Sequence, residues 1–185
     1  QWRGYDRVIV RTGHPDEVRT ETEHLFYQGM DDDHLPSGTR SVEVTDSTGT
    51  SVADDEVFNG QIRETIVRDG VGGDVVSKTI TTPWKRKTAE RTFSWGTVEA
   101  HMVNTESTDV HTALADGSFR QTREVNTFDS YGMVDSTHDF GDVDDPEDDR
   151  CTTTTFARNT SKHMLALVAR TQTVSAAPGE SPSYP

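Results

Sequence analysis

The sequence predicts an all-β protein built as an antiparallel meander of β-hairpins. Three observations support this fold class. Apolar and polar residues alternate with a period of two along most of the chain, whereas the 3.6-residue period of a helix is almost absent. Valine and threonine, whose branched Cβ suits a pleated strand, supply 19 and 27 of the 185 residues. Turns rich in glycine, aspartate and serine recur about every 8 to 12 residues.

The N-terminal third is predicted to hold three strands and one helical turn. The elements expected there are strands at 5–12, 17–28 and 39–46, with a tight turn at 46–49. Residues 53–60 are too short for more than one helical turn. Asp54 is the expected cap of that turn and Gly60 its end.

The rest of the chain is predicted to form hairpins. The expected pairs are 61–69 with 74–82, 90–95 with 97–105, and 107–115 with 119–129. Further strands are expected at 133–140, 150–157 and 168–175, and a short helix at 159–167. No βαβ spacing occurs in the sequence, so a doubly wound sheet is excluded.

Length and composition predict one thin domain. Residues 1–175 read as a β-hairpin repeat segment and 176–185 as a linker or tail rich in proline and serine. Leucine, isoleucine, valine and phenylalanine together make up 35 of the 185 residues, which suits an extended sheet better than a compact sandwich. Because the chain starts without methionine and ends inside the tail, we expect it to be a piece of a longer polypeptide.

The net charge of -14 and the pI of about 4.8 exclude nucleic acid as a partner, since binding to phosphates requires a basic face. The sequence also lacks an apolar run long enough to span a bilayer, so we expect no membrane insertion. The acidity fits two origins, a functional acidic surface or adaptation of the source to salt.

A dense acid cluster between residues 139 and 149 is the main candidate for a metal site. The candidate ligands for Ca²⁺ are Asp139, Asp142, Asp144, Asp145 and Asp148. The spacing departs from the EF-hand loop, because the sixth position counted from Asp142 is Glu147 where that loop requires glycine. Two interpretations stay open, a solvated turn and a Ca²⁺ site. A weaker second candidate is Asp31, Asp32 and Asp33 beside His34.

The sequence offers no catalytic residue that we can name, and we expect no enzyme activity and no cofactor other than Ca²⁺. The Gly-x-Ser-x-Gly, HExxH and CxxC motifs are all missing from the sequence, and Cys151 has no histidine near it along the chain. The basic run that starts at Trp84 allows two interpretations: a sugar-stacking surface, or a loop whose tryptophan anchors a sheet edge.

One short motif connects the chain to a known family. In FDSYGMV, Asp129 can accept hydrogen bonds from the backbone of a turn, and Gly132 can supply a positive φ. Phe128 and Val134 can then pack on the flanking strands. This pattern resembles the YD repeat of Rhs-type proteins, Tyr-Asp-x-x-Gly-Arg-Leu/Val, with Phe128 in the place of tyrosine and Met133 in the place of arginine.

Residues 27–49 and 141–160 also look like the corresponding stretches of large Rhs-repeat proteins from actinobacteria, and the resemblance covers most of residues 2–175. It implies a secreted or cell-surface bacterial protein whose hairpins form a curved β-shell around a C-terminal toxin segment. This chain would then be a structural part of the wall, with the remainder of the same polypeptide and the enclosed toxin segment as its partners. The alternative from the residues alone is a free-standing acidic adhesion or ligand-binding domain, extracellular and stabilised by Ca²⁺.

Overall fold

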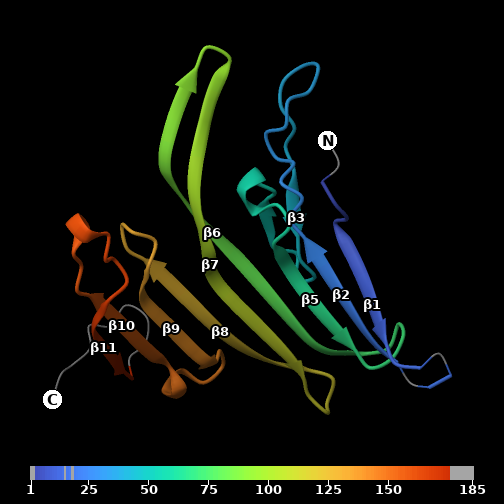
Figure 1. The fold of residues 1–185 in the computed structure, drawn as a ribbon. Coiled ribbons are helices and arrows are strands. Elements are labelled where there is room, and N and C mark those ends of the chain that lie inside the picture. The colour runs from blue at the N-terminus through green and yellow to red at the C-terminus, as the bar shows by residue number, and fades with distance from the viewer. Residues whose placement is uncertain (1–2, 15, 18, 176–185) are drawn as a thin grey trace.

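The protein folds around one long antiparallel sheet (Figure 1). A computed structural model describes residues 3–14, 16–17 and 19–175, so the predicted tail at 176–185 lies outside the described residues. Within the described part, nine strands follow one another in the order β1-β2-β5-β6-β7-β8-β9-β10-β11, and each neighbouring pair is antiparallel. The predicted all-β meander is confirmed.

The elements have the following bounds. The sheet consists of β1 Arg7–Thr12, β2 Thr20–Phe26, β5 Ile62–Arg68, β6 Val75–Phe93, β7 Gly96–Ala113, β8 Phe119–Phe128, β9 Val134–Asp142, β10 Arg150–Phe156 and β11 Val168–Val174. A separate ribbon pairs β3 Glu43–Thr45 with β4 Ser51–Ala53. The 3₁₀ turns are η1 Glu56–Phe58, η2 Pro146–Asp148 and η3 Thr160–Lys162.

Two local predictions need correction. The turn η1 is capped by Asp55, whose side chain accepts from the backbone N–H of Val57 at 3.2 Å. The predicted cap, Asp54, binds other backbone groups with its side chain. The short helix expected at 159–167 is reduced to the single turn η3, because His163 adopts a left-handed conformation with φ 54° and ends it.

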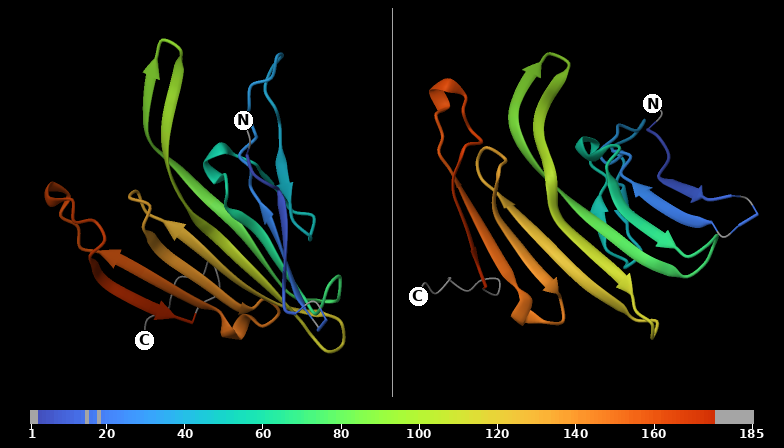
Figure 2. Two further views of the ribbon diagram at one scale, coloured as in Figure 1. Left: turned by 45° about the vertical axis from the view of Figure 1, so that its right-hand side comes forward. Right: turned by 60° about the horizontal axis from the view of Figure 1, so that its bottom comes forward.

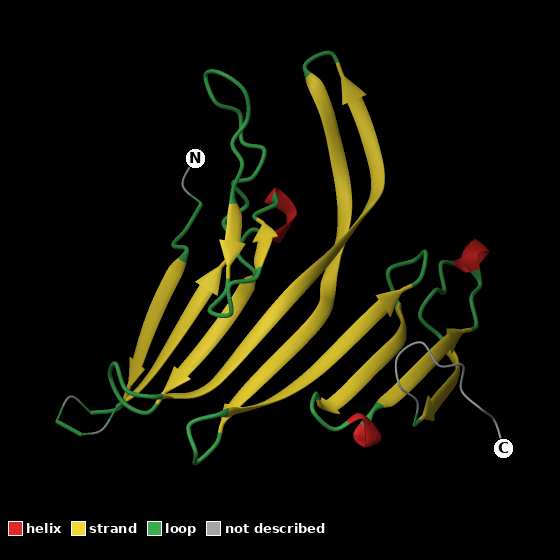
Figure 3. Ribbon diagram, turned by 180° about the vertical axis from the view of Figure 1, so that it is seen from behind, coloured by secondary structure: helices red, strands yellow, loops and turns green. Residues whose placement is uncertain are grey.

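The strands β6 and β7 are longer than predicted. Pro83 does not end β6, because it lies at a bulge where the register between β6 and β7 shifts. β5 pairs with β6 at Val75–Ile80, and β8 pairs with β7 at Ser107–Ala113, whereas β6 and β7 stay paired as far as Phe93 and Gly96. The part beyond the neighbouring strands, residues 85–103, is called the arm here, and it projects from the sheet (Figures 1 and 3).

The two faces of the sheet differ in composition. The cross-strand register places threonines from all nine strands of the sheet on one face, the threonine face, where pairs such as Thr65 with Thr79 and Thr152 with Thr173 lie opposite each other. Stiff β-branched side chains in opposed pairs stabilise a sheet without a thick apolar core. The face consists of Thr12, Thr20, Thr22, Thr65, Thr79, Thr81, Thr108, Thr112, Thr122, Thr137, Thr152, Thr154, Thr171 and Thr173.

The apolar core is small and lies at one end of the sheet, where the β3–β4 ribbon approaches β2 and β5 (Figure 2). Tyr27, Val44 and Phe58 are buried together, and the Tyr27 and Phe58 rings have centroids 5.6 Å apart. Val103 at the root of the arm packs against this cluster. The apolar cluster therefore fixes the ribbon and the arm to the sheet.

Candidate functional site

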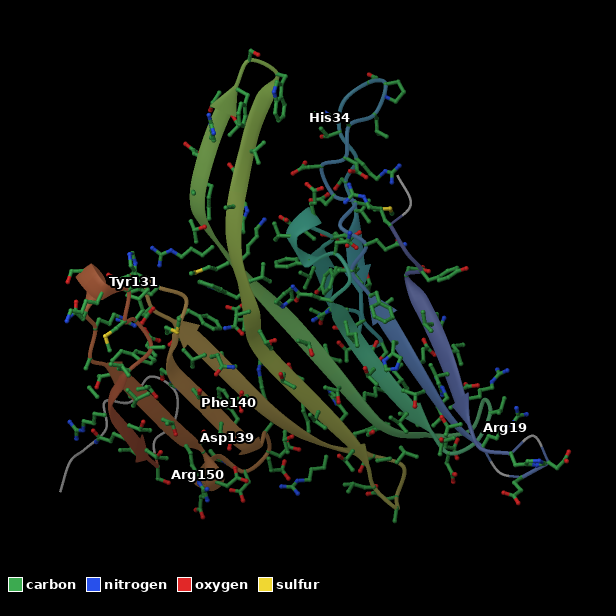
Figure 4. All side chains as sticks on the ribbon, in the orientation of Figure 1. Arg19, His34, Tyr131, Asp139, Phe140 and Arg150 are labelled. Atoms are coloured by element: carbon green, nitrogen blue, oxygen red, sulfur yellow. The ribbon has the colours of Figure 1, made fainter. Side chains whose placement is uncertain are left out.

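The acid-rich residues 139–149 span the end of β9 and the loop to β10, and three of their carboxylates close turns in their own backbone. Oδ1 of Asp139, of Asp142 and of Asp145 each accepts from the backbone N–H two residues later, at 3.0, 3.2 and 3.1 Å. These are Asx turns, which use carboxylate oxygens that a metal ion would otherwise bind. Asp144 is exposed. Asp139 also lies opposite Arg150 in the β9–β10 ladder (Figure 4).

Asp148 crosses the same loop. Its Oδ2 accepts from the N–H of Asp142 at 3.0 Å, and its Oδ1 is buried against Gly141, where a Cβ would lie 2.2 Å away. Oδ2 of Asp142 accepts from Nε of Arg120 at 3.0 Å. Among residues 3–14, 16–17 and 19–175, no three carboxylate, histidine or cysteine side chains are placed to hold a metal ion. The five predicted ligands therefore lie close together along the chain without converging on a common point.

The second acidic candidate lines a cleft beside the arm. The cleft has a volume of about 650 Å³ and lies between the 31–34 loop and the arm. His34 lies just below the tip of that loop, where it forms a bridge with Thr39 (Figure 4). Asp33 pairs with Arg3 at 2.7 Å, and Oδ1 of Asp31 accepts from the N–H of Val42 at 2.9 Å. The carboxylates that line the cleft are Asp31, Asp32, Asp33, Asp55, Glu56 and Glu99.

The motif at residues 128–134 forms the tight turn between β8 and β9. Oδ1 of Asp129 accepts from the N–H groups of Tyr131 and Met133 at 2.7 and 3.2 Å. Gly132 has φ +74°, a conformation that suits glycine, and Phe128 lies opposite Val134 in the ladder. The turn therefore has both predicted features: hydrogen bonds from its backbone to Asp129 and a positive φ at Gly132.

Arg158 is the main partner of this turn, and it comes from the loop between β10 and β11. Its guanidinium pairs with Oδ2 of Asp129 and lies over the Tyr131 and Phe156 rings, 4.5 and 4.8 Å from their centroids. Nε of Arg158 donates to the carbonyl of Leu165 at 3.2 Å. A cation between two aromatic rings and a carboxylate is held in one orientation. Arg158 thus ties the 157–167 loop to the turn.

The surroundings of Asp129 favour its charged form. Burial alone would raise the pKa of this carboxyl, but the backbone N–H groups of Tyr131 and Met133 and the charge of Arg158 outweigh it, so the pKa lies below its usual value. The ion pair is therefore present throughout the neutral range.

The other side of the turn contacts the root of the arm. Trp84 stacks on Phe128 with ring centroids 4.4 Å apart, and Nη1 of Arg86 donates to the carbonyl of Asp129 at 3.3 Å. These contacts agree with the interpretation of Trp84 as an anchor in the sheet rather than as a sugar-stacking surface. The turn therefore connects the hairpin before it with the hairpin after it.

Replacing Gly132 by alanine is expected to destabilise the protein by about 1–2 kcal/mol, because an L-residue is strained at positive φ. The added Cβ would also lie 2.7 Å from Sδ of Met102, but this flexible side chain can move away. Urea unfolding measures the change. The comparison is Gly117→Ala in the turn between β7 and β8, which has φ +85° and no atom within 4 Å of a Cβ; it should lose a similar amount, because strain at positive φ and not the Met102 contact sets the cost. A Gly132→Ala variant as stable as the wild type would contradict the role of this turn.

Sequence reasoning missed a buried ion pair beneath the β3–β4 ribbon. Nη2 of Arg63 donates to Oδ2 of Asp46 at 2.5 Å, and both side chains are 1% exposed. Nη1 of Arg63 also donates to the carbonyl of Thr81 at 2.9 Å. Oδ1 of Asp46 accepts from the N–H and Oγ1 of Thr48, at 2.8 and 2.6 Å. The pair joins the ribbon to β5 and β6.

The same group of side chains perturbs two pKa values. Burial raises the pKa of Tyr27 to about 12, although the Arg63 charge opposes this. Burial would also raise the pKa of Asp46, but hydrogen bonds from Thr48 and Thr50 and the charge of Arg63 hold it below its usual value. The phenol is therefore neutral and the carboxylate charged at neutral pH.

Asp54 is a second buried carboxylate. The sequence predicted it as a helix cap and not as an acceptor for the backbone of another segment. Its Oδ1 accepts from the N–H groups of Gln28 and Gly29, both at 2.8 Å, and its Oδ2 from that of Met30 at 3.0 Å. Asp54 is only 1% exposed. Because three successive N–H groups donate to this one carboxylate, Asp54 holds the backbone of residues 28–30, which follow β2, in place.

The register of β9 and β10 gives Cys151 a neighbour that the linear sequence hides. His138 lies directly opposite Cys151, with Nε2 3.7 Å from Sγ, and Oγ of Ser136 is 3.5 Å from the same sulfur. All three residues are half-buried on the face opposite the threonines. Only the strand register, which the sequence does not determine by itself, could have predicted this pair.

Comparison with known proteins identifies no relative: no family model, no curated protein and no solved structure matches this chain. Across residues 3–14, 16–17 and 19–175, no helix has both the length and the apolar character needed to cross a bilayer.

Proposed function

We propose that this chain is a structural segment of an Rhs/YD-repeat polypeptide and forms part of the wall of a β-shell that encloses a C-terminal toxin segment. The observation that carries the proposal is the turn at Asp129, whose sequence resembles the YD repeat and whose side chain binds the turn's own backbone. In this role the chain is architectural and performs no catalysis.

The contacts of the turn support a repeat architecture. In repeat proteins each unit contacts its sequence neighbours and gains stability from those interfaces. Asp129 accepts from Arg158 of the following hairpin and from Arg86 of the preceding arm. In the YD repeat an arginine follows the glycine, and here Met133 stands in that place. We propose that Arg158 supplies the missing cation from the next hairpin.

The edges of the sheet also support the proposal. Within the described residues β1 pairs with β2 alone and β11 with β10 alone, so each leaves a row of backbone groups without a strand partner. Both edges carry exposed apolar side chains, including Ile9, Val10 and Val168 at 47, 45 and 58% exposure. Unpaired edges with exposed apolar side chains favour the addition of a further strand. Neighbouring hairpins of the same polypeptide would satisfy both edges.

The single-layered sheet suits a wall. Its curvature is visible in Figure 2, and most of its side chains on both faces are exposed or half-buried. A sheet with one apolar cluster at one end gains stability from chain packed beside it. The partners of the proposal are thus the remainder of the polypeptide and its enclosed toxin segment, and the expected location is the outside of a bacterial cell, secreted or surface-bound.

Electron cryomicroscopy of the polypeptide encoded by the complete gene tests the proposal. We expect a closed shell in which β1 and β11 each pair with a strand outside these 185 residues. A free domain on a linker, with β1 and β11 at open edges, would contradict the proposal.

The Ca²⁺-binding adhesion domain makes a different prediction for metal ions. Because Asp139, Asp142, Asp145 and Asp148 already accept backbone hydrogen bonds, we expect ~1 mM Ca²⁺ to change the Tm no more than ~1 mM Mg²⁺ does. Differential scanning fluorimetry with Ca²⁺, Mg²⁺ and EDTA measures this. A rise in Tm specific to Ca²⁺, and abolished in Asp148→Asn, would favour the adhesion domain.

A further inference from the structure

The arm is anchored at its root and exposed at its tip. At the root, Trp84 stacks on Phe128, Lys85 pairs with Asp55, and Val103 joins the apolar cluster. Beyond this point the arm is a two-stranded ribbon that extends past its neighbouring strands (Figures 1 and 3). Two-stranded ribbons are marginally stable by themselves in water, so this one gains stability from any surface that covers it.

The tip of the arm carries a stack of side chains typical of a protein interface. The Phe93 and Trp95 rings are parallel to within 7°, with centroids 4.9 Å apart, and the Arg91 guanidinium lies 4.8 Å from the Phe93 centroid. Trp95 is nevertheless 73% exposed, and Val98 on the paired strand is 48% exposed. Tryptophan and arginine dominate the binding energy of interfaces, where they enter desolvated pockets.

The charge of the arm differs in sign from the rest of the chain. Residues 85–103 hold four cations and two carboxylates, a net charge of +2. Because the whole chain has a net charge of -14, the remaining residues have a net charge of -16. The positively charged arm is therefore complementary in charge to a negatively charged surface, such as that of the rest of this chain. Charge complementarity of this kind selects partners and speeds association.

The acidic cleft lies at the same end of the molecule as the tip. The distal part of the arm forms one wall of the cleft through Thr97, Val98 and Glu99, and the 31–34 loop forms the other. Arm and loop project side by side in Figures 1 and 4. The cleft volume of about 650 Å³ leaves room for an aromatic side chain and a guanidinium.

We propose that two copies of this chain form a two-fold dimer in which the tip of each arm enters the acidic cleft of the other copy. Because tip and cleft lie at one end, a two-fold axis across that end brings each tip to the opposite cleft, as an isologous interface requires. Arg91 then faces the carboxylates of the cleft, including Glu56, and Trp95 is buried. This inference is independent of the proposed role in a shell.

Sedimentation velocity over a range of concentrations tests the dimer. The wild type is expected to dimerise, and more weakly at ~500 mM than at ~50 mM salt, because the charges are only partly buried. Trp95→Ala and Arg91→Glu are each expected to weaken dimerisation by about 30-fold or more. Lys162→Glu, a charge reversal at an exposed residue on η3, is the control and should dimerise as the wild type does.

A mixing experiment then tests the reciprocal contact. Arg91→Glu and Glu56→Lys are each expected to be monomeric alone, because each places like charges at both contacts. Mixed in equal amounts, the two variants should form a heterodimer, because both contacts then join opposite charges. Both residues are exposed, and the pair of Glu56 with Arg3 is long, at 3.5 Å, and open to solvent at Glu56, so the circular dichroism spectra should match the wild type and the Tm values should lie close to it.

Three results would overturn the proposal. The first is a wild type that stays monomeric at every concentration. The second is a dimer unaffected by Trp95→Ala, which would place the interface at the edge strands β1 or β11. The third is a mixture of Arg91→Glu and Glu56→Lys that forms no heterodimer although the wild type dimerises.

Discussion

Replacing Arg63 by methionine is expected to destabilise the protein by about 3–5 kcal/mol at pH 7, because it leaves the Asp46 carboxylate buried without its cation. Methionine fills most of the space of the arginine stem, so the loss reports mainly on charge. Urea unfolding followed by tryptophan fluorescence measures the change. The control is Arg120→Met, which breaks an exposed pair with Asp142 and should cost no more than about 1 kcal/mol.

A second variant separates charge from packing. In Arg63→Met with Asp46→Asn, the amide oxygen can still accept from Thr48, and no charge remains in the site. We expect this double variant to be more stable than Arg63→Met alone. Equal stability of the two would mean that lost packing, rather than an unpaired charge, explains the effect of Arg63→Met.

The cost of Arg63→Met should depend on pH in a defined direction. In the wild type the pKa of Asp46 is lowered, so its contribution to stability is present above the unfolded pKa of about 3.9 and is lost as the pH falls through the lower folded value. Without the charge of Arg63, the pKa of Asp46 is higher than in the wild type, so the carboxylate is protonated at a higher pH and the unpaired charge is relieved. The difference in unfolding free energy between wild type and variant should therefore shrink from pH 7 towards pH ~4.

Asp54→Ala is expected to destabilise the protein by at least about 3 kcal/mol, because it leaves three backbone N–H groups without their acceptor. Hydrogen exchange locates the effect: the amides of Gln28, Gly29 and Met30 should exchange faster, while those of β8 and β9 should change little. Unfolding in urea gives the total cost.

Asp54→Asn is the matched control for this prediction. The amide oxygen can accept from Gln28 and Gly29, but the NH₂ group cannot accept from Met30. An intermediate stability is therefore expected. If Asp54→Ala were as stable as the wild type, the three hydrogen bonds would not fix this segment, and the position of the 31–34 loop beside the cleft would need another explanation.

Local pattern was enough to predict the sheet, because alternation and branched side chains act within each strand. The turn at Asp129 was equally local, since one aspartate and one glycine determine its backbone. The length of the arm was not predicted, because Pro83 and the basic run looked like a break. The structure accommodates Pro83 at a bulge and spreads the cations along an exposed ribbon.

The buried polar contacts could not be read from the sequence. Arg63 and Asp46 are 17 residues apart and meet because the β3–β4 ribbon folds back onto the sheet. His138 faces Cys151 through the strand register alone. The acid-rich residues 139–149 are a different case. Their composition fits both a metal site and a series of Asx turns, which use some of the same carboxylate oxygens, so composition cannot tell the two apart.

Hydrogen exchange at the two edge strands most directly tests the claim that this chain is one section of a longer wall. The amides of β1 and β11 that do not bond to β2 or β10 are compared in the 185-residue chain and in the polypeptide encoded by the complete gene. Our account predicts nearly unprotected exchange in the chain alone and at least ~100-fold slower exchange in the complete polypeptide, with β5 and β6 equally protected in both. Equally fast exchange at β1 and β11 in both proteins would contradict it.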